Sequence, residues 1–405
     1  MANQPKRILL TGGRSTITLD IARHFHKAGH FVYVADSHRK HICKFSNAVS
    51  KNFQVPSPRF HSEQFIESLI SIIEKHNIDL YIPTCEETIY ISYALSKFPK
   101  SCEVFCEPFE LLHSLHSKWL FMEKLKELGI DVPKTVLIKS QNDLENLNLP
   151  YSYALKATYS RASQNMCRVD PGSAAPAVKI EPYNPWVAQE WIKGVKYCTY
   201  SIVKEGKIYA HSTYPVSFTV DGSSCITFEA IRHQKILDWV TRFVGLTRFT
   251  GQIAFDFIET DQSKLYAIEC NPRATHGLHL FNEDDEIQKG FFGENKEIIH
   301  PKEGTLKQIG MGMVAFGWRS VNRGPQLPGF LKNFFAAKDV VYQKNDLKPF
   351  FAMGTLFPMY WYMCKKYRLP LSAVFTFDTD WNGEAIYIHE PQEAECTTKK
   401  KLNMG

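Results

Sequence analysis

Two carboxylates and an amide at positions 256–271 form the residue pattern that most clearly indicates chemistry. Asp256 lies between two phenylalanines, and Glu269, Asn271 and Arg273 follow in a Glu-x-Asn-Pro-Arg run. A hairpin would place Asp256 beside Glu269, and Asn271 would point to the same face because side chains alternate along a strand. Two carboxylates and an amide oxygen suit Mg²⁺, or Mn²⁺ in its place, with other positions left for phosphate and water. We expect these three residues to ligate metal. Arg273 adds a fixed cation for a phosphate or carboxylate.

An ordinary surface hairpin with exposed acids is the alternative explanation of this pattern. Strand alternation favours the metal site, because it buries Ile268 and Cys270 on one side and gathers the three oxygen ligands on the other. The polar turn at residues 261–263 supports the hairpin itself.

A lysine and a polar loop near residue 156 are suited to binding phosphate. Lys156 ends an apolar strand predicted at Tyr153–Lys156, from which its ammonium group can reach a phosphate. A strand-end lysine that only extends into water is the alternative. In the loop that follows, hydroxyls such as that of Ser160 and the guanidinium of Arg161 can cover a polyphosphate.

A third segment, at residues 187–194, carries the groups that an adenine ring requires. Glu190 can accept a hydrogen bond from the exocyclic amine, and the backbone of Trp191 and Ile192 can pair with the ring edge. Taken alone, this segment fits an edge strand and turn better, so its assignment depends on the other motifs.

The elements that must position these residues alternate between strand and helix over the first 110 residues. Short apolar runs predict strands, and apolar residues at helical spacing predict the helices between them. This βαβ pattern indicates a parallel sheet with helices on both faces. The predicted strands are Arg7–Leu10, Phe31–Ala35 and Leu80–Ile82, and the predicted helices begin at Thr16 and Ser62. A further helix is predicted after this part, at Ser117–Leu128.

From about residue 135 to 270 the pattern is rich in strands, and after about residue 300 it is mostly helical. One helix is predicted within the strand-rich part, at Thr227–Val244. The most apolar stretch, Pro349–Met363, is shorter than a bilayer span and is interrupted by Pro358. We expect a buried pair of helices there, with a segment on a membrane surface as the alternative.

Composition excludes several classes of protein. The 405 residues are 44% hydrophobic and 22% charged, which is typical of a globular chain and not of a disordered or collagenous one. The net charge of 48 − 42 = +6 is spread over the chain, which gives no case for nucleic-acid binding. No signal-peptide pattern opens the sequence and no Cys-x-x-Cys occurs among the ten cysteines, so we expect reduced thiols, a cytoplasmic location and no membrane span.

Residues 1 to about 300 resemble the ATP-grasp superfamily of carboxylate–amine ligases, in the branch similar to one half of the carbamoyl-phosphate-synthase large subunit. The order of motifs carries the resemblance: an α/β opening, a helix beginning at Ser117-Lys118, the strand lysine, the hinge at residues 189–192, and the Asp…Glu-x-Asn-Pro-Arg set. It implies an α/β and α+β fold, and we expect the chain to form three parts. The resemblance covers a pre-ATP-grasp (Rossmann-like) domain at 1–114 and an ATP-grasp domain of two α+β subdomains at 115–300. The third part, a mostly helical C-terminal accessory region at 301–405, is predicted from the residue pattern.

The resemblance also implies a function, an ATP-dependent ligase. Such an enzyme activates a carboxylate as an acyl phosphate for attack by an amine or related nucleophile. ATP and Mg²⁺ are the implied cofactors, and Lys118 and Lys156 would contact the ATP phosphates. Glu190 and Ile192 would hold the adenine, and Arg273 would face the acyl phosphate. The implied partners are a small-molecule carboxylate and an amine, and a homodimer is left open.

Two departures from the family pattern keep other functions open. The phosphate-covering loop is usually rich in glycine, but residues 160–166 contain none, so Arg161 is expected to replace backbone donors with its own charge. Lys196 stands where many members place an acid that holds the ribose. A non-catalytic ATP-binding protein with a degenerate phosphate loop is therefore one alternative. A second, an NAD-dependent oxidoreductase, would use the glycines before Arg14 together with Asp36, but Arg14 occupies the place of the second fingerprint glycine.

Overall fold

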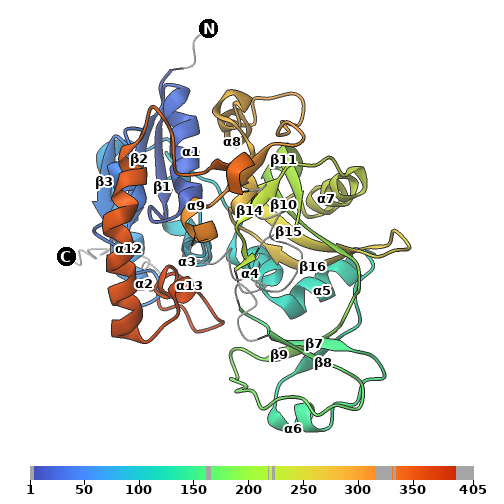
Figure 1. Ribbon diagram of the computed structural model, residues 1–405. Helices are drawn as coiled ribbons and strands as arrows, with labels where there is room; N and C mark the ends of the chain where they lie inside the picture. Colours follow the sequence, from blue (N-terminus) through green and yellow to red (C-terminus); the bar gives the residue numbers. More distant parts are fainter. Residues whose placement is uncertain are drawn as a thin grey trace, which may run out of the picture.

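The computed structural model contains a parallel α/β layer, two larger antiparallel sheets and a C-terminal helical part (Figure 1). The residues that it describes are 4–160, 166–217, 219–220, 224–314, 331 and 334–388. The parallel layer followed by antiparallel sheets confirms the predicted fold class.

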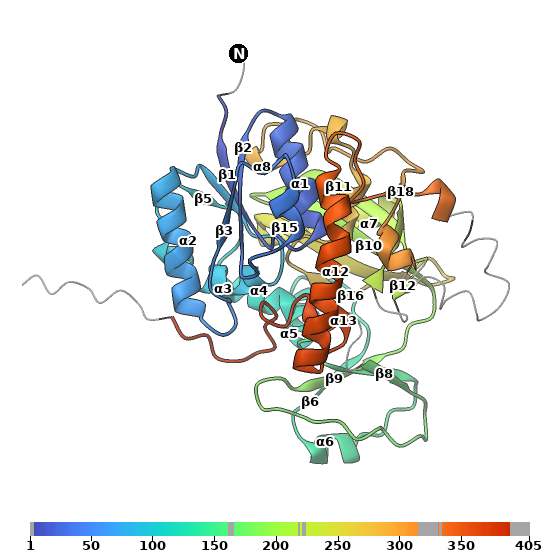
Figure 2. The ribbon, with the colours of Figure 1, turned by 60° about the vertical axis from the view of Figure 1, so that its left-hand side comes forward.

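The N-terminal sheet is parallel, with five strands in the order β3-β2-β1-β4-β5. Its central strand, β1, is buried except at Arg7 because helices cover both faces of the sheet, and Figure 2 shows α1 and α2 on opposite sides of it. The Ser15 hydroxyl caps the N-terminus of α1 by accepting a hydrogen bond from the Ile17 N–H. The elements of this part are β1 Arg7–Thr11, α1 Thr16–Lys27, β2 Phe31–Asp36, η1 Ile42–Phe45, β3 Lys51–Gln54, α2 Ser62–His76, β4 Leu80–Ile82, α3 Glu87–Tyr93, η2 Leu95–Lys97, β5 Glu103–Val104 and α4 Phe109–His116.

Two four-stranded antiparallel sheets follow, in the orders β6-β9-β7-β8 and β11-β10-β15-β16. The first sheet, with α6, projects from the rest of the molecule (Figure 1). Helix α5 precedes it, capped by the Ser117 hydroxyl. The elements are α5 Lys118–Glu127, β6 Thr135–Ile138, α6 Gln141–Glu145, β7 Tyr153–Ala157, β8 Met166–Val169, β9 Trp186–Glu190, β10 Val195–Lys204, β11 Lys207–Pro215, α7 Gln234–Thr247, β15 Gly251–Glu259 and β16 Leu265–Asn271.

The helix predicted at Thr227–Val244 is wrong in its first part. Thr227–Glu229 is instead strand β14, which pairs with β17 in a small sheet completed by β18. Phe228 is fully buried there, so sheet burial overrides the helical spacing. Helix α7 begins after His233, whose ring caps it by accepting a hydrogen bond from the Ile236 N–H at 3.4 Å. The remaining elements are β12 Thr219–Val220, β13 Ser224–Cys225, η3 His276–Leu280, η4 Glu283–Asp285, α8 Gln288–Phe292, β17 Leu306–Gln308, α9 Gly310–Gly312 and β18 Lys338–Asp339.

The C-terminal apolar stretch forms one helix, α12 Lys348–Tyr367, and not the predicted buried pair. Pro358 lies inside α12 but is exposed, as is Gly354, so the carbonyl group that Pro358 leaves without a backbone donor can bond to water. One face of α12 is buried against η1 and the short helix α13 Leu371–Val374, and the opposite face is exposed. Among the described residues, no helix is both long and apolar enough to cross a bilayer.

Candidate functional site

The hairpin of β15 and β16 brings the predicted metal ligands together. Asp256 lies directly opposite Glu269 in the strand register, and Asn271 lies opposite Ala254, further along the same face. Phe255 and its register partner Cys270 point to the opposite face of the hairpin, where both are buried. The structure therefore gathers the three oxygen-bearing side chains on one face.

A β-bulge at this point corrects one expectation. The register shifts between Asp256 and Phe257, so Ile268 is an extra residue on β16. Ala267 shares the buried face with Cys270, whereas Ile268 is only half-buried, so the expectation that Ile268 is hidden was wrong. The Ile268 carbonyl accepts a hydrogen bond from the Lys156 ammonium at 3.4 Å. The bulge thus turns a backbone acceptor toward that lysine.

The two facing carboxylates have opposite pKa shifts. Burial and the negative charge of Glu269 raise the pKa of Asp256 to about 6. Burial also disfavours the ionised form of Glu269, but the charges of Lys118, Lys156 and Arg273 outweigh it and hold the pKa of Glu269 below its ordinary value. Glu269 is therefore firmly ionised, whereas Asp256 takes up a proton near pH 6.

The donor set fits a hard divalent cation. Asp256 and Glu269 supply two carboxylates and Asn271 an amide oxygen, which are the oxygen types that Mg²⁺ takes. No group of three His, Cys, Asp or Glu side chains in the described ranges is placed to hold a metal ion, and the metal role of Asp256, Glu269 and Asn271 stays a prediction. The Asn271 Oδ1 atom accepts a hydrogen bond from Arg273 Nη2 at 2.9 Å, which orients that amide.

Two buried lysines approach the carboxylates from different elements. Lys118 begins α5, and its Nζ lies 3.4 Å from a carboxylate oxygen of Glu269 and 2.9 Å from the carbonyl oxygen of Ser160. Lys156, on β7, donates to the Gln189 side-chain carbonyl at 2.9 Å. Burial lowers the pKa of Lys156 to about 8. Both ammonium groups are held in place beside Glu269, which suits a polyphosphate better than a mobile surface lysine would.

Arg273 links this hairpin to the N-terminal sheet. Its Nη2 atom lies 3.4 Å from the Glu86 carboxylate, in the loop that follows β4. The Gln252 side chain donates to the carbonyl of Pro83 in the same loop at 2.9 Å. The Arg273 side chain is 14% exposed, so it stays accessible to a small molecule while its position is fixed.

The three residues predicted to contact adenine lie together at the end of β9. The Glu190 carboxylate accepts from the Lys134 N–H at 3.3 Å, and the Trp191 N–H donates to the Ser152 carbonyl at 2.8 Å. These contacts fix the segment that leads to Ile192, and the adenine role of all three residues stays a prediction. At Gly194, just beyond them, a Cβ atom would collide with the backbone carbonyl of Glu259, so this crossing requires glycine.

The predicted phosphate loop is described only at its start. Ser160 is half-buried, and its hydroxyl donates to the Ala157 carbonyl at 3.2 Å while its own carbonyl accepts from Lys118. Arg161 lies outside the described residues, so its role stays a prediction.

Gln189 is a site residue to which the sequence interpretation gave no role of its own. It is buried, and it holds the Lys156 ammonium group from the neighbouring strand. Val187 is the register partner of Lys156, and alternation puts Gln189 on the same face as Val187, but this register is known only from the structure.

A C-terminal segment to which the sequence assigned no role packs beside the site. Trp381 is buried, with its ring 5.0 Å from that of Tyr159 and 6.1 Å from that of His116, measured between centroids. Tyr159 immediately precedes Ser160, and His116 lies two residues before Lys118. The segment around Trp381 thus supports both chain segments that carry phosphate-binding candidates.

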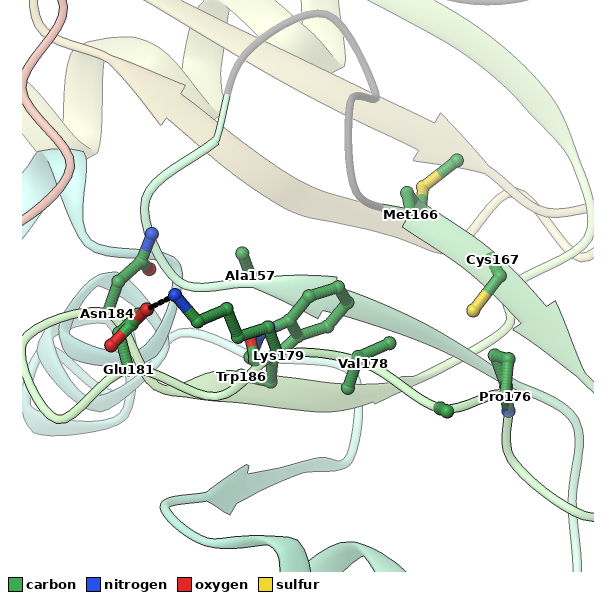
Figure 3. Close-up of a pocket in the computed structure, with 10 residues that line it drawn as sticks. Ala157, Met166, Cys167, Pro176, Val178, Lys179, Glu181, Asn184 and Trp186 are labelled. Carbon is green, nitrogen blue, oxygen red and sulfur yellow. Dashed lines mark hydrogen bonds and ion pairs between the residues drawn. The ribbon is translucent and has the colours of Figure 1, made fainter.

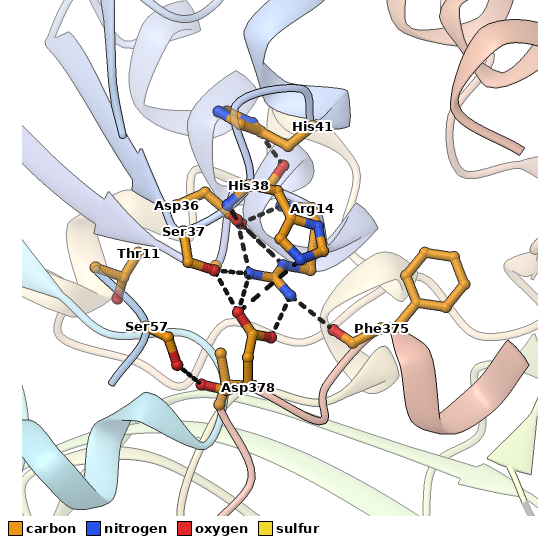
Figure 4. A network of polar contacts seen from close by, with 12 residues as sticks. Thr11, Arg14, Asp36, Ser37, His38, His41, Ser57, Phe375 and Asp378 are labelled. Carbon is orange, nitrogen blue, oxygen red and sulfur yellow. Dashed lines mark hydrogen bonds and ion pairs between the residues drawn. The ribbon is translucent and has the colours of Figure 1, made fainter. Parts of the chain in front are cut away.

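The same C-terminal segment is fastened to the N-terminal sheet through Arg14 (Figure 4). The Arg14 guanidinium donates to Asp378 at 2.6 Å and to Asp36 at 2.8 Å, and all three side chains are buried. Asp36 is the acid that a dinucleotide would need for its ribose, and here it is engaged by Arg14. This pairing disfavours the NAD-dependent alternative.

A cavity of about 520 Å³ lies in the projecting sheet, on the side away from Lys156 (Figure 3). Its walls include Ala157 and Trp186, which are register partners on one face of the sheet, whereas Lys156 points to the other face. Two charged residues of its wall, Lys179 and Glu181, pair with each other. The cavity is therefore separate from the phosphate-binding candidates.

Comparison with known proteins identifies this arrangement. Residues 115–277 match the family model described as the ATP-grasp domain. A search of curated proteins by sequence finds no match.

Solved structures share the fold at low sequence identity. N5-carboxyaminoimidazole synthetase from Staphylococcus aureus is 14% identical, with 79% of this chain and 87% of that chain covered and a TM-score of 0.59. L-amino acid ligase from Bacillus licheniformis is 13% identical, with 76% and 81% covered and a TM-score of 0.59. The biotin carboxylase domain of 2-oxoglutarate carboxylase from Hydrogenobacter thermophilus, a dimer in complex with ADP, its magnesium salt and bicarbonate, is 11% identical, with 75% and 73% covered and a TM-score of 0.56.

The matched region contains both buried lysines and the facing carboxylates of β15 and β16, and the shared fold extends over most of each chain. Residues 115–277 of this chain therefore form an ATP-grasp domain.

Proposed function

We propose that this protein is an ATP-dependent ligase, which activates a substrate carboxylate as an acyl phosphate and joins it to an amine. One observation carries the proposal: the facing carboxylates of Asp256 and Glu269 are surrounded by the fixed positive charges of Lys118, Lys156 and Arg273. A metal–nucleotide complex needs oxygen ligands for the metal and cations for the phosphates within one small volume.

The reaction proceeds in two displacements. A carboxylate oxygen of the substrate attacks the γ-phosphorus of ATP, the bond from that phosphorus to the bridging oxygen breaks, and ADP leaves. The amine nitrogen then attacks the carbonyl carbon of the acyl phosphate, the carbon–oxygen bond to phosphate breaks, and the nitrogen loses a proton. Phosphate is the second product. The protein contributes positioning and charge in both displacements.

Each charged residue has a distinct part in this proposal. Asp256, Glu269 and Asn271 would hold Mg²⁺, which when bound neutralises charge on the transferring phosphate. Lys118 and Lys156 would bind phosphate oxygens, and Gln189 keeps Lys156 in place. Arg273 would bind the acyl phosphate. The adenine would lie against residues 190–192, with Arg161 over the phosphates.

A screen for ADP release tests the proposal. The purified protein is incubated with Mg-ATP and pooled carboxylic acids and amines. The pools include amino acids and bicarbonate, because solved structures with this fold are named as an amino acid ligase and as a carboxylase with bicarbonate. We expect ADP release that requires both an acid and an amine. ADP release that no pool alters would contradict the ligase assignment.

A non-catalytic ATP-binding protein is the second candidate, favoured by the absence of glycine from residues 160–166. Such a protein would bind Mg-ATP in calorimetry yet release no ADP with any acid and amine pool. The intact set of Asp256, Glu269 and Asn271 is the reason to prefer the ligase.

A further inference from the structure

Helix α12 has an outward face made largely of aromatic side chains. Phe351, Trp361 and Tyr362 are 70%, 56% and 65% exposed. Their spacing along the helix places them on the side opposite the buried residues. The other exposed aromatic residues on the outward side of α12 or just before it are Tyr342, Phe350 and Phe357. We call this set, with Phe351, Trp361 and Tyr362, the aromatic face.

The opposite side of α12 is firmly fixed to the protein, so the aromatic face is a permanent feature of the surface. Ala352, Leu356 and Tyr360 are buried, and the Tyr360 ring lies 4.2 Å from that of Phe375. Just before the helix, Asp346 is buried and pairs with Arg23 of α1 at 3.0 Å. Exposed single apolar residues are common on proteins, but several exposed aromatic rings on one side of a single helix indicate an interaction surface.

The charges on the segment that forms α12 have one sign. No Asp or Glu occurs between Asp346 and Asp378, whereas Lys348, Lys365 and Lys366 lie near the ends of the helix and Arg368 follows it. The Lys365 ammonium lies 3.7 Å from the centre of the Trp361 ring. Aromatic rings flanked by lysines are the composition of helices that lie in the interface of a membrane, where the rings enter the headgroup layer and the lysines meet anionic lipids.

We propose that the aromatic face of α12 docks on an anionic lipid surface. The helix would lie along the membrane, since no helix in the described part of the chain is long and apolar enough to cross one. Charge decides between this partner and a second copy of the chain, because two like-charged faces would repel each other while an anionic surface attracts both the lysines and Arg368. The proposal does not depend on which reaction the ATP-grasp domain catalyses.

Vesicle co-sedimentation of the full chain tests the proposal. The probes are vesicles of phosphatidylcholine with and without phosphatidylglycerol. We expect binding that needs phosphatidylglycerol and weakens with added salt. The double variant F351S/W361S should bind about tenfold more weakly or worse, since binding scales with the apolar area that is buried. The matched control is Phe31→Ser, which removes a ring that is 49% exposed at the start of β2, and it should bind like the original chain.

A second variant separates charge from packing. K365Q/K366Q leaves every ring in place, and we expect a loss of about fivefold for each lysine removed. Both double variants keep the basic run at residues 399–401, so that run cannot account for their losses. Several results would overturn the proposal: no binding to either kind of vesicle, equal binding to both kinds, or unchanged binding by F351S/W361S. A dimer that F351S/W361S converts to a monomer, without vesicle binding, would assign the face to a second copy of the chain instead.

Discussion

Asp256 and Glu269 face each other across two paired strands, yet their pKa values move in opposite directions. Despite burial, the nearby positive charges of Lys118 and Lys156 lower the pKa of Glu269. Burial and the negative charge of Glu269 raise the pKa of Asp256. The protein therefore compensates the charge of Glu269 but not fully that of Asp256, which suits a site where a bound cation supplies the remaining positive charge.

We predict that Glu269→Gln abolishes ADP release while the fold persists. The amide keeps the shape of the side chain but removes the charge that a metal ion needs. The side chain is 26% exposed, so we expect the free energy of unfolding to fall by less than about 2 kcal/mol. The measurements are steady-state kinetics and denaturant unfolding, with Glu229→Gln on the exposed surface of β14 as the control. Turnover near that of the original chain would refute the metal assignment.

We predict that Lys156→Ala weakens binding of Mg-ATP but not of adenosine. The ammonium group is proposed to serve phosphate, and a charged hydrogen bond contributes roughly 1.5–3 kcal/mol, which is about ten- to a hundredfold in affinity. Calorimetric titration with each ligand measures the two effects, and Lys139→Ala, at an exposed position of the projecting sheet, is the control. Equal losses for ATP and adenosine would make Lys156 a structural residue.

The residues of the metal set could be predicted because the information is local. Asp256, Glu269 and Asn271 lie in one hairpin, where alternation and a short turn determine which side chains meet. The bulge at Ile268 could not be predicted, since a shift of one residue leaves no mark on composition. Lys118 lies far away in the sequence, and only the family resemblance implied its place in the site.

At the scale of elements, the segment around Trp381 connects parts of the chain that are far apart. It packs against His116 before α5 and Tyr159 after β7, and Gly383 has a φ of 93° with the Tyr159 ring close to where a Cβ would stand. The segment can therefore hold the projecting sheet in place relative to α5.

We predict that Trp381→Ala loosens the start of the phosphate loop. Removing a buried tryptophan ring costs about 3–5 kcal/mol of stability, and amide hydrogen exchange across β7 and Ser160 should become faster. Trp361→Ala, which removes an exposed ring from α12, should change neither measurement appreciably. Exchange in β7 that stays as slow in Trp381→Ala as in the original chain would show that the segment does not support the loop.

Elements whose burial is decided locally were predicted better than those decided by distant contacts. Strand β4 was predicted with its observed bounds, and β1 and β2 to within one residue. Thr227–Glu229 was predicted as helix because its pairing with β17, some 80 residues later in the sequence, is invisible in local spacing. For α12, we predicted that Pro358 would end the helix. The helix can continue through Pro358 because the residue is exposed, and the cost is only a bend or one lost hydrogen bond.

At the scale of the whole molecule, Arg14, Asp36 and Asp378 join the two ends of the described chain (Figure 4). No sequence pattern relates residue 14 to residue 378, so this contact could not be predicted. Burial raises the pKa of Asp36, but the charge of Arg14 outweighs it and brings the value to about 2.

We predict that this network makes stability depend on pH below about 4. The folded pKa of Asp36 lies below its unfolded value, so its contribution is complete above the unfolded value and is lost as the pH falls toward 2. The loss should amount to about 2 kcal/mol. Urea unfolding from pH 7 to pH 2 measures it for the original chain, for Asp36→Asn and for the exposed control Asp261→Asn. An identical pH dependence in all three chains would show that Asp36 does not contribute.

The central claim is that a substrate carboxylate attacks ATP, and oxygen transfer tests it most directly. An acid identified by the ADP-release screen is labelled with ¹⁸O in its carboxylate and turned over in unlabelled water. If an acyl phosphate forms, one carboxylate oxygen leaves with the phosphorus, and each phosphate released in the reaction should carry one ¹⁸O atom. Phosphate without label, formed while ADP accumulates, would show that water attacks ATP, and would contradict the account.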